Sequence, residues 1–259
     1  MGVAVTTTEV TPTLHLLAGP AVNAVVLTDV PPARGVPFTL VDSGYPGYAP
    51  ALHEAVTGLG LVWADLAAVL VTHAHIDHVG ALPALLADLT GVPVLTGEDE
   101  ARHARGEVHE SATPADLLPR LLQHGVAAWA AHIVANGATR HVTLPVVTAA
   151  PPGQAIDVPG HPVPLVTPGH TTGHTCFVVP EADAILTGDA LVTGHNLSRV
   201  AGPQVLRGFF QHDVPAVLES LALIEAAPAS LVVPGHGPVW REPLAEAAAL
   251  ARSRASQTL

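Results

Sequence analysis

Residues 72–80, with the sequence THAHIDHVG, restrict the possible folds of this chain more than any other segment. A short apolar run at residues 66–71 precedes them and is typical of a buried strand. Residues 80–86, which follow, are typical of the beginning of a helix. Four of the nine residues carry side chains that bind transition metals. The sequence therefore predicts metal ligands on a turn between a strand and a helix.

The four candidate ligands in this turn are His73, His75, Asp77 and His78. Because side chains alternate along an extended segment, we expect His73 and His75 to point the same way, about 6.6 Å apart along the strand. Two imidazoles on one face can bind one metal ion, whereas Asp77 and His78, beyond the strand, are turned elsewhere and can serve a second ion. The turn therefore predicts two metal sites but supplies too few ligands to complete either of them.

Three later segments place a histidine or an aspartate beside glycine at the end of an apolar run: residues 167–175, 186–190 and 233–237. Each of them alone is typical of an ordinary turn. Small residues at a strand end let the backbone approach closely, as a metal cleft at the edge of a sheet requires. The four segments in this order therefore indicate a single cleft, to which the later three contribute His170, Asp189 and His236.

The composition predicts a globular protein, because 49% of the 259 residues are hydrophobic and only 12% are charged. We see no flexible linker and expect a single domain over residues 1–259. Since no apolar run is long enough to cross a bilayer and residues 1–13 contain no Lys or Arg, we expect neither membrane insertion nor a secretory signal. The single Cys176 excludes an intrachain disulfide, and the expected location is the cytoplasm.

The charge of the chain argues against nucleic acid as a partner. The net charge is −12, and all ten basic residues are arginines that form no cluster. Neutralisation of phosphates supplies most of the affinity for nucleic acids, so a chain of this charge lacks its main source. We expect a small-molecule substrate.

Local patterns predict strands on both sides of a helical middle part. Strands are expected at residues 14–17, 24–28, 37–41, 141–147, 155–158, 163–166, 175–179, 184–186 and 231–233, and helices at residues 50–58, 214–225 and 242–252. Residues 98–140 lack strand-like runs and carry apolar residues at helical spacing, which predicts a helical insertion. Trp129 and Ile133 on its inner face pack on the core, form the wall of a substrate pocket, or do both.

The four turns together resemble the metallo-β-lactamase superfamily of metal-dependent hydrolases, through residues 73–78, 169–170, 188–189 and 235–236. The resemblance extends from about residue 14 to residue 240. It implies an α+β fold, a four-layer αββα sandwich with a binuclear metal centre at the sheet edge. By this resemblance one metal ion is held by His73, His75 and His170, the second by Asp77, His78 and His236, and Asp189 bridges both.

The donor types agree with this assignment. Imidazole and carboxylate ligands suit zinc, and two Zn²⁺ ions per chain are expected, with iron or manganese as alternatives. Two such ions share a hydroxide that attacks at neutral pH and polarise the substrate carbonyl. Asp77 is the expected catalytic residue, which orients the hydroxide and passes its proton to the leaving group. Asp42 is expected to hydrogen-bond a ligand imidazole, and His174 to support the site from behind.

Differences within the superfamily narrow the activity. Asp189 stands where a class of true β-lactamases has a cysteine, and Cys176 is out of register with that position. A bridging aspartate instead resembles the glyoxalase II, lactonase and thioesterase branches. The apolar insertion favours a substrate with an uncharged, hydrophobic portion, and the candidate pocket residues are Tyr45, Trp129, Ile133 and His195. We therefore expect a binuclear zinc hydrolase that cleaves an ester, lactone or thioester.

Two alternatives stay open. A mononuclear iron oxygenase of the persulfide dioxygenase type uses two histidines and one carboxylate as ligands, which would leave His78 and His236 outside the metal site. A non-catalytic metal-binding module is the other alternative, although a degraded ligand set would be typical of it and this set is complete. Metal identity, metal stoichiometry and turnover distinguish the three.

Overall fold

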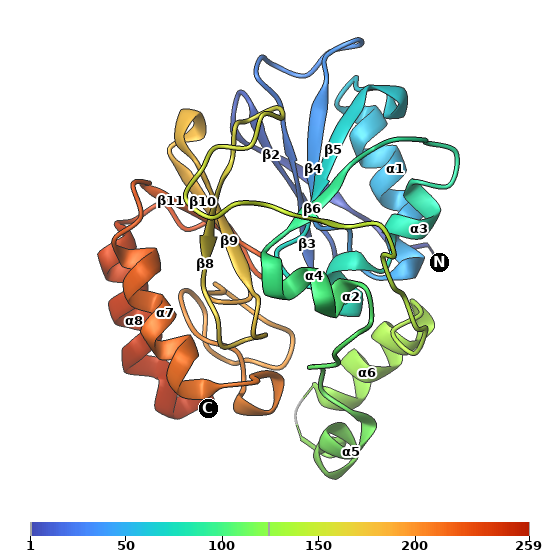
Figure 1. Ribbon diagram of the computed structural model, residues 1–259. Helices are drawn as coiled ribbons and strands as arrows, with labels where there is room; N and C mark the ends of the chain where they lie inside the picture. The colour runs from blue at the N-terminus through green and yellow to red at the C-terminus, as the bar shows by residue number, and fades with distance from the viewer. Residues whose placement is uncertain (1, 124, 259) are drawn as a thin grey trace.

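The structure is a computed structural model that describes residues 2–123 and 125–258. Two β-sheets lie at its centre (Figure 1). Neighbouring strands of the first sheet are antiparallel from β1 to β4 and parallel from β4 to β7. Its seven strands, in spatial order, are β1 (Thr6–Thr11), β2 (Leu14–Ala18), β3 (Asn23–Leu27), β4 (Phe38–Val41), β5 (Leu66–Leu70), β6 (Val94–Thr96) and β7 (Thr148–Ala149).

The second sheet has four strands in the order β11, β10, β9, β8. They are β8 (Val163–Val166), β9 (Thr175–Val179), β10 (Ala184–Gly188) and β11 (Leu231–Pro234). β10 is parallel to β11 and antiparallel to β9, which in turn is antiparallel to β8. Every residue of β9 and β10 is buried, because side chains on both faces of this sheet are covered.

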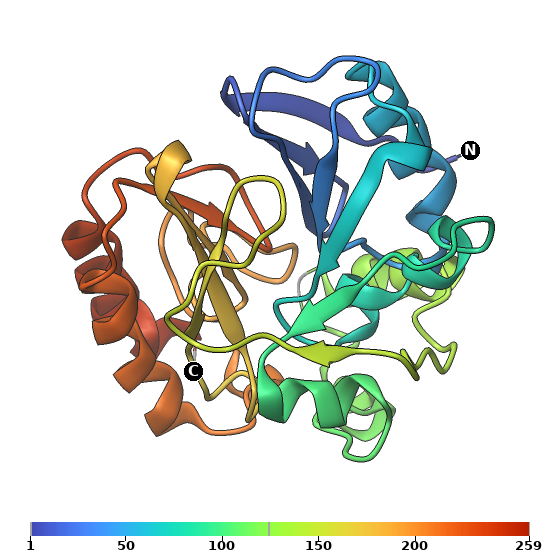
Figure 2. The same cartoon turned by 45° about the horizontal axis from the view of Figure 1, so that its top comes forward.

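Helices cover the outer face of each sheet. α1 (Ala49–Gly58) and α3 (Leu82–Leu85) pack on the first sheet and form the first core cluster with it. α7 (Val214–Glu225) and α8 (Leu244–Thr258) pack on the second sheet and form the second core cluster (Figure 2). Between the sheets, a third core cluster joins Leu14 and Leu27 of one sheet to Phe177 and Leu186 of the other. The predicted four-layer αββα sandwich is thereby confirmed. No helix in the described part of the chain has both the length and the apolar character needed to cross a membrane.

Most predicted elements form, and two predicted strands do not. Residues 141–147 form no strand, because Leu144 donates its backbone N–H to Ala104 in α4 (Glu98–Ala104) and the chain pairs with β6 only at residues 148–149. Residues 155–158 are also not a strand. Ile156 donates its backbone N–H to the carbonyl of Pro162 and His161 donates to that of Val158, so this segment forms turns. In the other direction, β1, β6 and the short β7 were not predicted.

The described residues of 98–140 contain helices and no strand, as expected. They form α4, α5 (Pro114–Leu117), a single 3₁₀ turn at Leu118–Arg120 and α6 (Val126–Ala135). The apolar spacing alone predicts a longer helix, but Pro119 and Gly125 interrupt it; Gly125 has a positive φ of 79°. The apolar residues at helical spacing are therefore divided among α5, the 3₁₀ turn, the turn that follows it and α6.

Candidate metal centre

The candidate ligands follow strands of both sheets at one edge of the sandwich. β5 ends at Leu70, ahead of His73 and His75, and β10 ends immediately before Asp189. Because β5 is parallel to β4 and β10 is parallel to β11, the ends that carry candidate ligands meet at the same edge. His73 and His75 lie in the loop between β5 and α2 (Ile76–Val79), which confirms the predicted turn between a strand and a helix, although the strand itself ends at Leu70.

The first group of donors consists of three imidazoles from two loops. Nε2 of His73 lies 3.1 Å from Nδ1 of His75, and Nε2 of His170 lies 3.1 Å and 3.0 Å from these two atoms. Tetrahedral ligands at the usual Zn–N distance are separated by about 3.3 Å. The three nitrogen atoms are therefore spaced as ligands of one ion would be.

The opposite ring nitrogens show that these atoms carry lone pairs. Nε2 of His75 donates to the backbone oxygen of Glu110 at 2.8 Å, and Nδ1 of His170 donates to Oε1 of Gln211 at 3.0 Å. The orientation of Gln211 is fixed because its amide nitrogen donates to the carbonyl of Leu206. In the neutral rings, the facing nitrogens of His75 and His170 therefore lack hydrogens. Two lone pairs 3.0 Å apart repel each other unless a cation lies between them, so these residues fit a metal ion.

The second group of donors consists of Asp77, His78 and His236. Oδ2 of Asp77 lies 3.6 Å from Nε2 of His236 and 3.9 Å from Nε2 of His78. Nδ1 of His236 donates to the backbone oxygen of Ala21 at 2.5 Å, which leaves its Nε2 facing the carboxylate. Nε2 of His78 is fully enclosed and has no hydrogen-bond partner among the described residues. An enclosed, unpaired nitrogen is costly without a bound ion and so supports the same fit.

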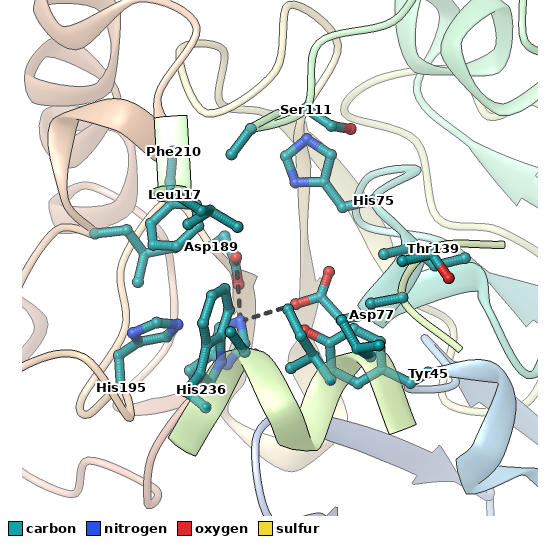
Figure 3. Close-up of a pocket in the computed structure, with 18 of the residues that line it drawn as sticks. Tyr45, His75, Asp77, Ser111, Leu117, Thr139, Asp189, His195, Phe210 and His236 are labelled. Atoms are coloured by element: carbon teal, nitrogen blue, oxygen red, sulfur yellow. Dashed lines mark ion pairs between the residues drawn. The ribbon is translucent and has the colours of Figure 1, made fainter. Parts of the chain in front are cut away.

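Asp189 lies between the two groups. Its Oδ2 is 3.4 Å from Nε2 of His170 and 3.2 Å from Nε2 of His236. Its Oδ1 is 3.4 Å from Nε2 of His78, and within the described structure this enclosed oxygen has no hydrogen-bond partner. One carboxylate oxygen in reach of both donor groups is the arrangement that a bridging ligand requires. Figure 3 shows the ion pairs of His236 with Asp189 and with Asp77.

The electrostatics of the two groups differ. Burial, together with the neighbouring imidazoles, holds the pKa of His73 and of His170 well below the ordinary value, so these rings are neutral. Burial also opposes the charging of His78 and His236, but the surrounding carboxylates, Asp189 first, raise the pKa of both. A metal ion at the second group would replace those protons, because metal binding to histidine releases them.

Asp42 connects one imidazole of each group. Its Oδ2 accepts a hydrogen bond from Nδ1 of His78 at 2.8 Å and another from the hydroxyl of Thr72 at 2.7 Å. Because that hydroxyl donates to Asp42, its oxygen accepts from Nδ1 of His73, which lies 3.2 Å away. Asp42 thus lies where it can orient ligands through hydrogen bonds.

His174 lies behind Asp189 and outside the donor groups. Its Nε2 accepts from the backbone N–H of Asp189 at 3.1 Å, and its Nδ1 is 2.9 Å from the hydroxyl of Thr167. Cys176 is enclosed between Thr167 and the second core cluster, and burial raises the pKa of its thiol to about 12. Among the described residues, Cys176 belongs to none of the candidate donor groups, which agrees with the expectation that it does not take the place of Asp189.

Glu100 is a residue of this site that the sequence did not reveal. It is fully buried in the first turn of α4, where its Oε1 accepts from the backbone N–H of Ala74 at 2.7 Å and from Nδ1 of His103 at 2.9 Å. Its Oε2 accepts from the hydroxyl of Thr171 at 2.5 Å. Since Ala74 separates His73 from His75 and Thr171 follows His170, one carboxylate ties together the two loops that carry the first group.

Replacing Glu100 with glutamine is expected to weaken metal binding at the first group by about 10- to 100-fold, the usual effect of losing a group that supports the ligands. The amide cannot accept all three hydrogen bonds that the carboxylate accepts. Zinc titration in competition with a chromophoric chelator measures the affinity. Glu98→Gln is the matched control, because Glu98 is exposed in the same helical turn. Equal affinities in folded samples of both variants would contradict a supporting role.

A cavity of about 600 Å³ opens beside the donor atoms. All four predicted pocket residues, Tyr45, Trp129, Ile133 and His195, line it. Trp129 and Ile133 also belong to the first core cluster, so the inner face of α6 is both core and pocket wall. The wall is completed chiefly by apolar residues, among them Leu118, Leu121 and Leu206, together with Leu117 and Phe210, which Figure 3 labels.

Comparisons with known proteins agree with this geometry. The chain is 25% identical over 221 residues to the protein named "Probable metallo-hydrolase YflN" of Bacillus subtilis, covering 80% of this chain and 77% of the relative. It is 29% identical over 175 residues to an atrochrysone carboxyl ACP thioesterase of Aspergillus fumigatus, covering 67% of this chain but only 39% of that enzyme. A solved metallo-β-lactamase family protein from Thermus thermophilus has the same fold, with a TM-score of 0.64 at 24% identity over 95% of this chain and 80% of that one.

The family model supplies the assignment. The model of the metallo-β-lactamase superfamily matches residues 20–236, a span that begins ahead of Asp42 and ends at His236. It therefore includes all seven candidate ligands. The chain belongs to the metallo-β-lactamase superfamily, whose members are metal-dependent.

Proposed function

We propose that this chain is a binuclear metal-dependent hydrolase that cleaves an ester, lactone or thioester bond of a partly hydrophobic small molecule. The observation that carries the proposal is the position of Asp189, whose Oδ2 lies within 3.4 Å of one imidazole from each donor group. When bound, two divalent ions, most simply zinc, would activate water and polarise the carbonyl of the substrate. The names of the two curated relatives, a metallo-hydrolase and a thioesterase, support the same class of reaction.

The residues of the second group have separate tasks in this proposal. Asp77 is only partly buried and lines the cavity, whereas His78 is fully enclosed. Asp77 is the more exposed of the two carboxylates that line the cavity, since Asp189 is buried, and it can therefore accept a proton from water there and return that proton to the leaving group. Tyr45 lies beside Asp77 (Figure 3), and burial together with the Asp77 charge raises its pKa well above the ordinary value. Its hydroxyl stays protonated and can donate.

The cavity wall supports a hydrophobic substrate portion. No residue in its described lining is a lysine or an arginine, so an anionic tail would find no countercharge there. Trp129 packs edge-on against Phe210, with ring centroids 5.8 Å apart. Such a surface stabilises acyl or ring groups by excluding water, at about 25 cal/mol per Å² of apolar area.

The test of the proposed function is metal analysis combined with a substrate panel. Protein purified without chelator is expected to contain two metal ions per chain and to hydrolyse members of a panel of aryl esters, lactones and acyl thioesters. Chelation should abolish turnover, and added zinc should restore it. One iron per chain with oxygen consumption would instead support the oxygenase, and a fully metallated protein without turnover would support the non-catalytic module.

Replacing Trp129 with alanine is expected to raise KM for p-nitrophenyl octanoate by about tenfold or more, since a large apolar contact is worth about 1.5–3 kcal/mol. The acetate ester does not reach this wall and should keep its KM. Ala128→Gly is the control, because it weakens the same helix at an exposed position without changing the wall. A change that is equal for both esters, or shared by the control, would show that Trp129 acts only in folding.

A further inference from the structure

His195 has a fixed proton position. It lies six residues beyond Asp189, in the loop after β10, and its Nδ1 accepts a hydrogen bond from the backbone N–H of Leu197 at 3.1 Å. A backbone N–H can only donate, so Nδ1 carries no hydrogen. A neutral imidazole must then carry its single hydrogen on Nε2, which makes Nε2 a hydrogen-bond donor and never an acceptor.

The ring of His195 lies directly beside the metal centre. Its centroid is 5.0 Å from that of His236, 5.5 Å from that of Phe210 and 6.0 Å from that of Trp129. His195 lines the cavity together with Asp189 and His236, on the opposite side from Tyr45 (Figure 3). Within the described structure, no group accepts a hydrogen bond from its Nε2. The donor is therefore available to a molecule in the cavity.

A second hollow of about 670 Å³ shares part of its lining with the first. Of the residues that line the apolar cavity, only His195 and His236 also line this hollow. The second hollow is bordered by Ala21, Asn196 and Arg241 and lacks the aromatic residues of the first. A molecule that places an apolar group in one hollow and another group in the other would bring the bond between them past His195.

We propose that Nε2 of His195 donates a hydrogen bond to the carbonyl oxygen of the substrate. This inference rests on the proposed hydrolase function. In the reaction, the oxygen of water forms a bond to the acyl carbon, the bond from carbon to the leaving oxygen or sulfur breaks, and one water proton passes to the leaving atom. Negative charge grows on the carbonyl oxygen as the transition state forms. The hydrogen bond from a donor that is already in position therefore becomes stronger, which stabilises the transition state. His195 transfers no proton in this role. If Nε2 lost its hydrogen, the ring could not take up another on Nδ1, because Nδ1 accepts the hydrogen bond from Leu197.

Two substitutions distinguish hydrogen-bond donation by Nε2 of His195 from the structural effect of its Nδ1 bond to Leu197. In His195→Asn, the side-chain oxygen takes the place of Nδ1 and can still accept from Leu197, but no donor reaches the place of Nε2. In His195→Gln, the terminal amide reaches that place and donates, while the bond to Leu197 is lost. Loss of one such donor typically lowers kcat by about 10²- to 10³-fold. We expect that loss in the asparagine variant with KM nearly unchanged, and recovery to within about tenfold of wild type in the glutamine variant.

The measurements use the metallated full chain and the aryl ester that wild type hydrolyses fastest. n-Butylboronic acid becomes tetrahedral when it adds hydroxide and so resembles the transition state. Its inhibition constant should be higher for the asparagine variant than for wild type, by about the same factor as kcat is lower. Metal content and melting temperature should match wild type in both variants. An unchanged kcat in His195→Asn, or a loss confined to His195→Gln, would overturn the inference. If wild type hydrolyses no ester, lactone or thioester, the hydrolase proposal itself fails and the inference falls with it.

Discussion

Replacing Asp189 with asparagine is expected to lower the occupancy of both metal sites, from two ions per chain to fewer than one, and to reduce kcat/KM by at least about 10³-fold. This is the order of effect expected when several kcal/mol of transition-state charge stabilisation are lost. The substitution keeps the size of the side chain but removes the negative charge that faces His78, His170 and His236. Because a single oxygen lies near both donor groups, both sites should weaken together.

The measurement for Asp189 is metal stoichiometry after dialysis against a weak chelator, followed by activity at saturating zinc. Asp88→Asn is the control, since Asp88 is an exposed aspartate. Circular dichroism shows whether the variant is folded. Full occupancy of two ions in a folded Asp189→Asn protein would contradict the bridging role, and loss of only one ion would assign Asp189 to one group.

Much of the site could be predicted from the sequence because its ligands occur in short segments that can be recognised without knowledge of the fold. Each later ligand stands beside glycine at the end of an apolar strand, and Gly188, with a φ of 46°, shows why a small residue is needed there. A Cβ on Gly188 would come within 2.8 Å of Thr72 and 2.7 Å of His174. Strand ends are readable from apolar runs, so the structure brings together the seven residues that the motif predicts as ligands.

The residues that hold those ligands could not be predicted in the same way. Glu100 reads as an ordinary acidic residue at the start of a helix, yet its carboxylate contacts Thr171, which is 71 positions away in the chain. Gln211 contacts His170 across 41 positions. Such contacts depend on how the layers pack, and the spacing of residues within one segment does not predict them. The tautomer of His195 likewise depends on where the N–H of Leu197 points.

The errors in the fold have a related cause. Residues 141–147 alternate as a strand does, but a strand also needs a neighbour with free backbone groups, and β6 offers only enough for residues 148–149. The helical stripe of the middle part spans Pro119 and Gly125, both of which interrupt helices. In both segments the apolar pattern also overstates burial, because Leu118, Leu122 and Val146 are exposed, whereas Trp129 and Leu144 are buried.

Replacing Asp77 with asparagine is expected to lower kcat by about 10²- to 10⁴-fold for phenyl butyrate, the range typical of losing a general acid–base group. For p-nitrophenyl butyrate the loss should be clearly smaller, because nitrophenolate departs without needing a proton. This contrast matters because Asp77 has two proposed roles. Its Oδ2 lies 3.6 Å from His236 as a ligand would, and the residue also faces the cavity.

Zinc dependence separates the two roles of Asp77. If the carboxylate is only a ligand, raising free zinc should restore the variant equally on both esters, and the contrast between leaving groups should vanish. If it also moves the proton, the contrast should persist when metal analysis shows two ions bound. Asp42→Asn is the informative comparison, because Asp42 reaches His78 through a hydrogen bond but is buried away from the cavity. That variant should weaken metal binding and, once zinc is restored, show no dependence on the leaving group.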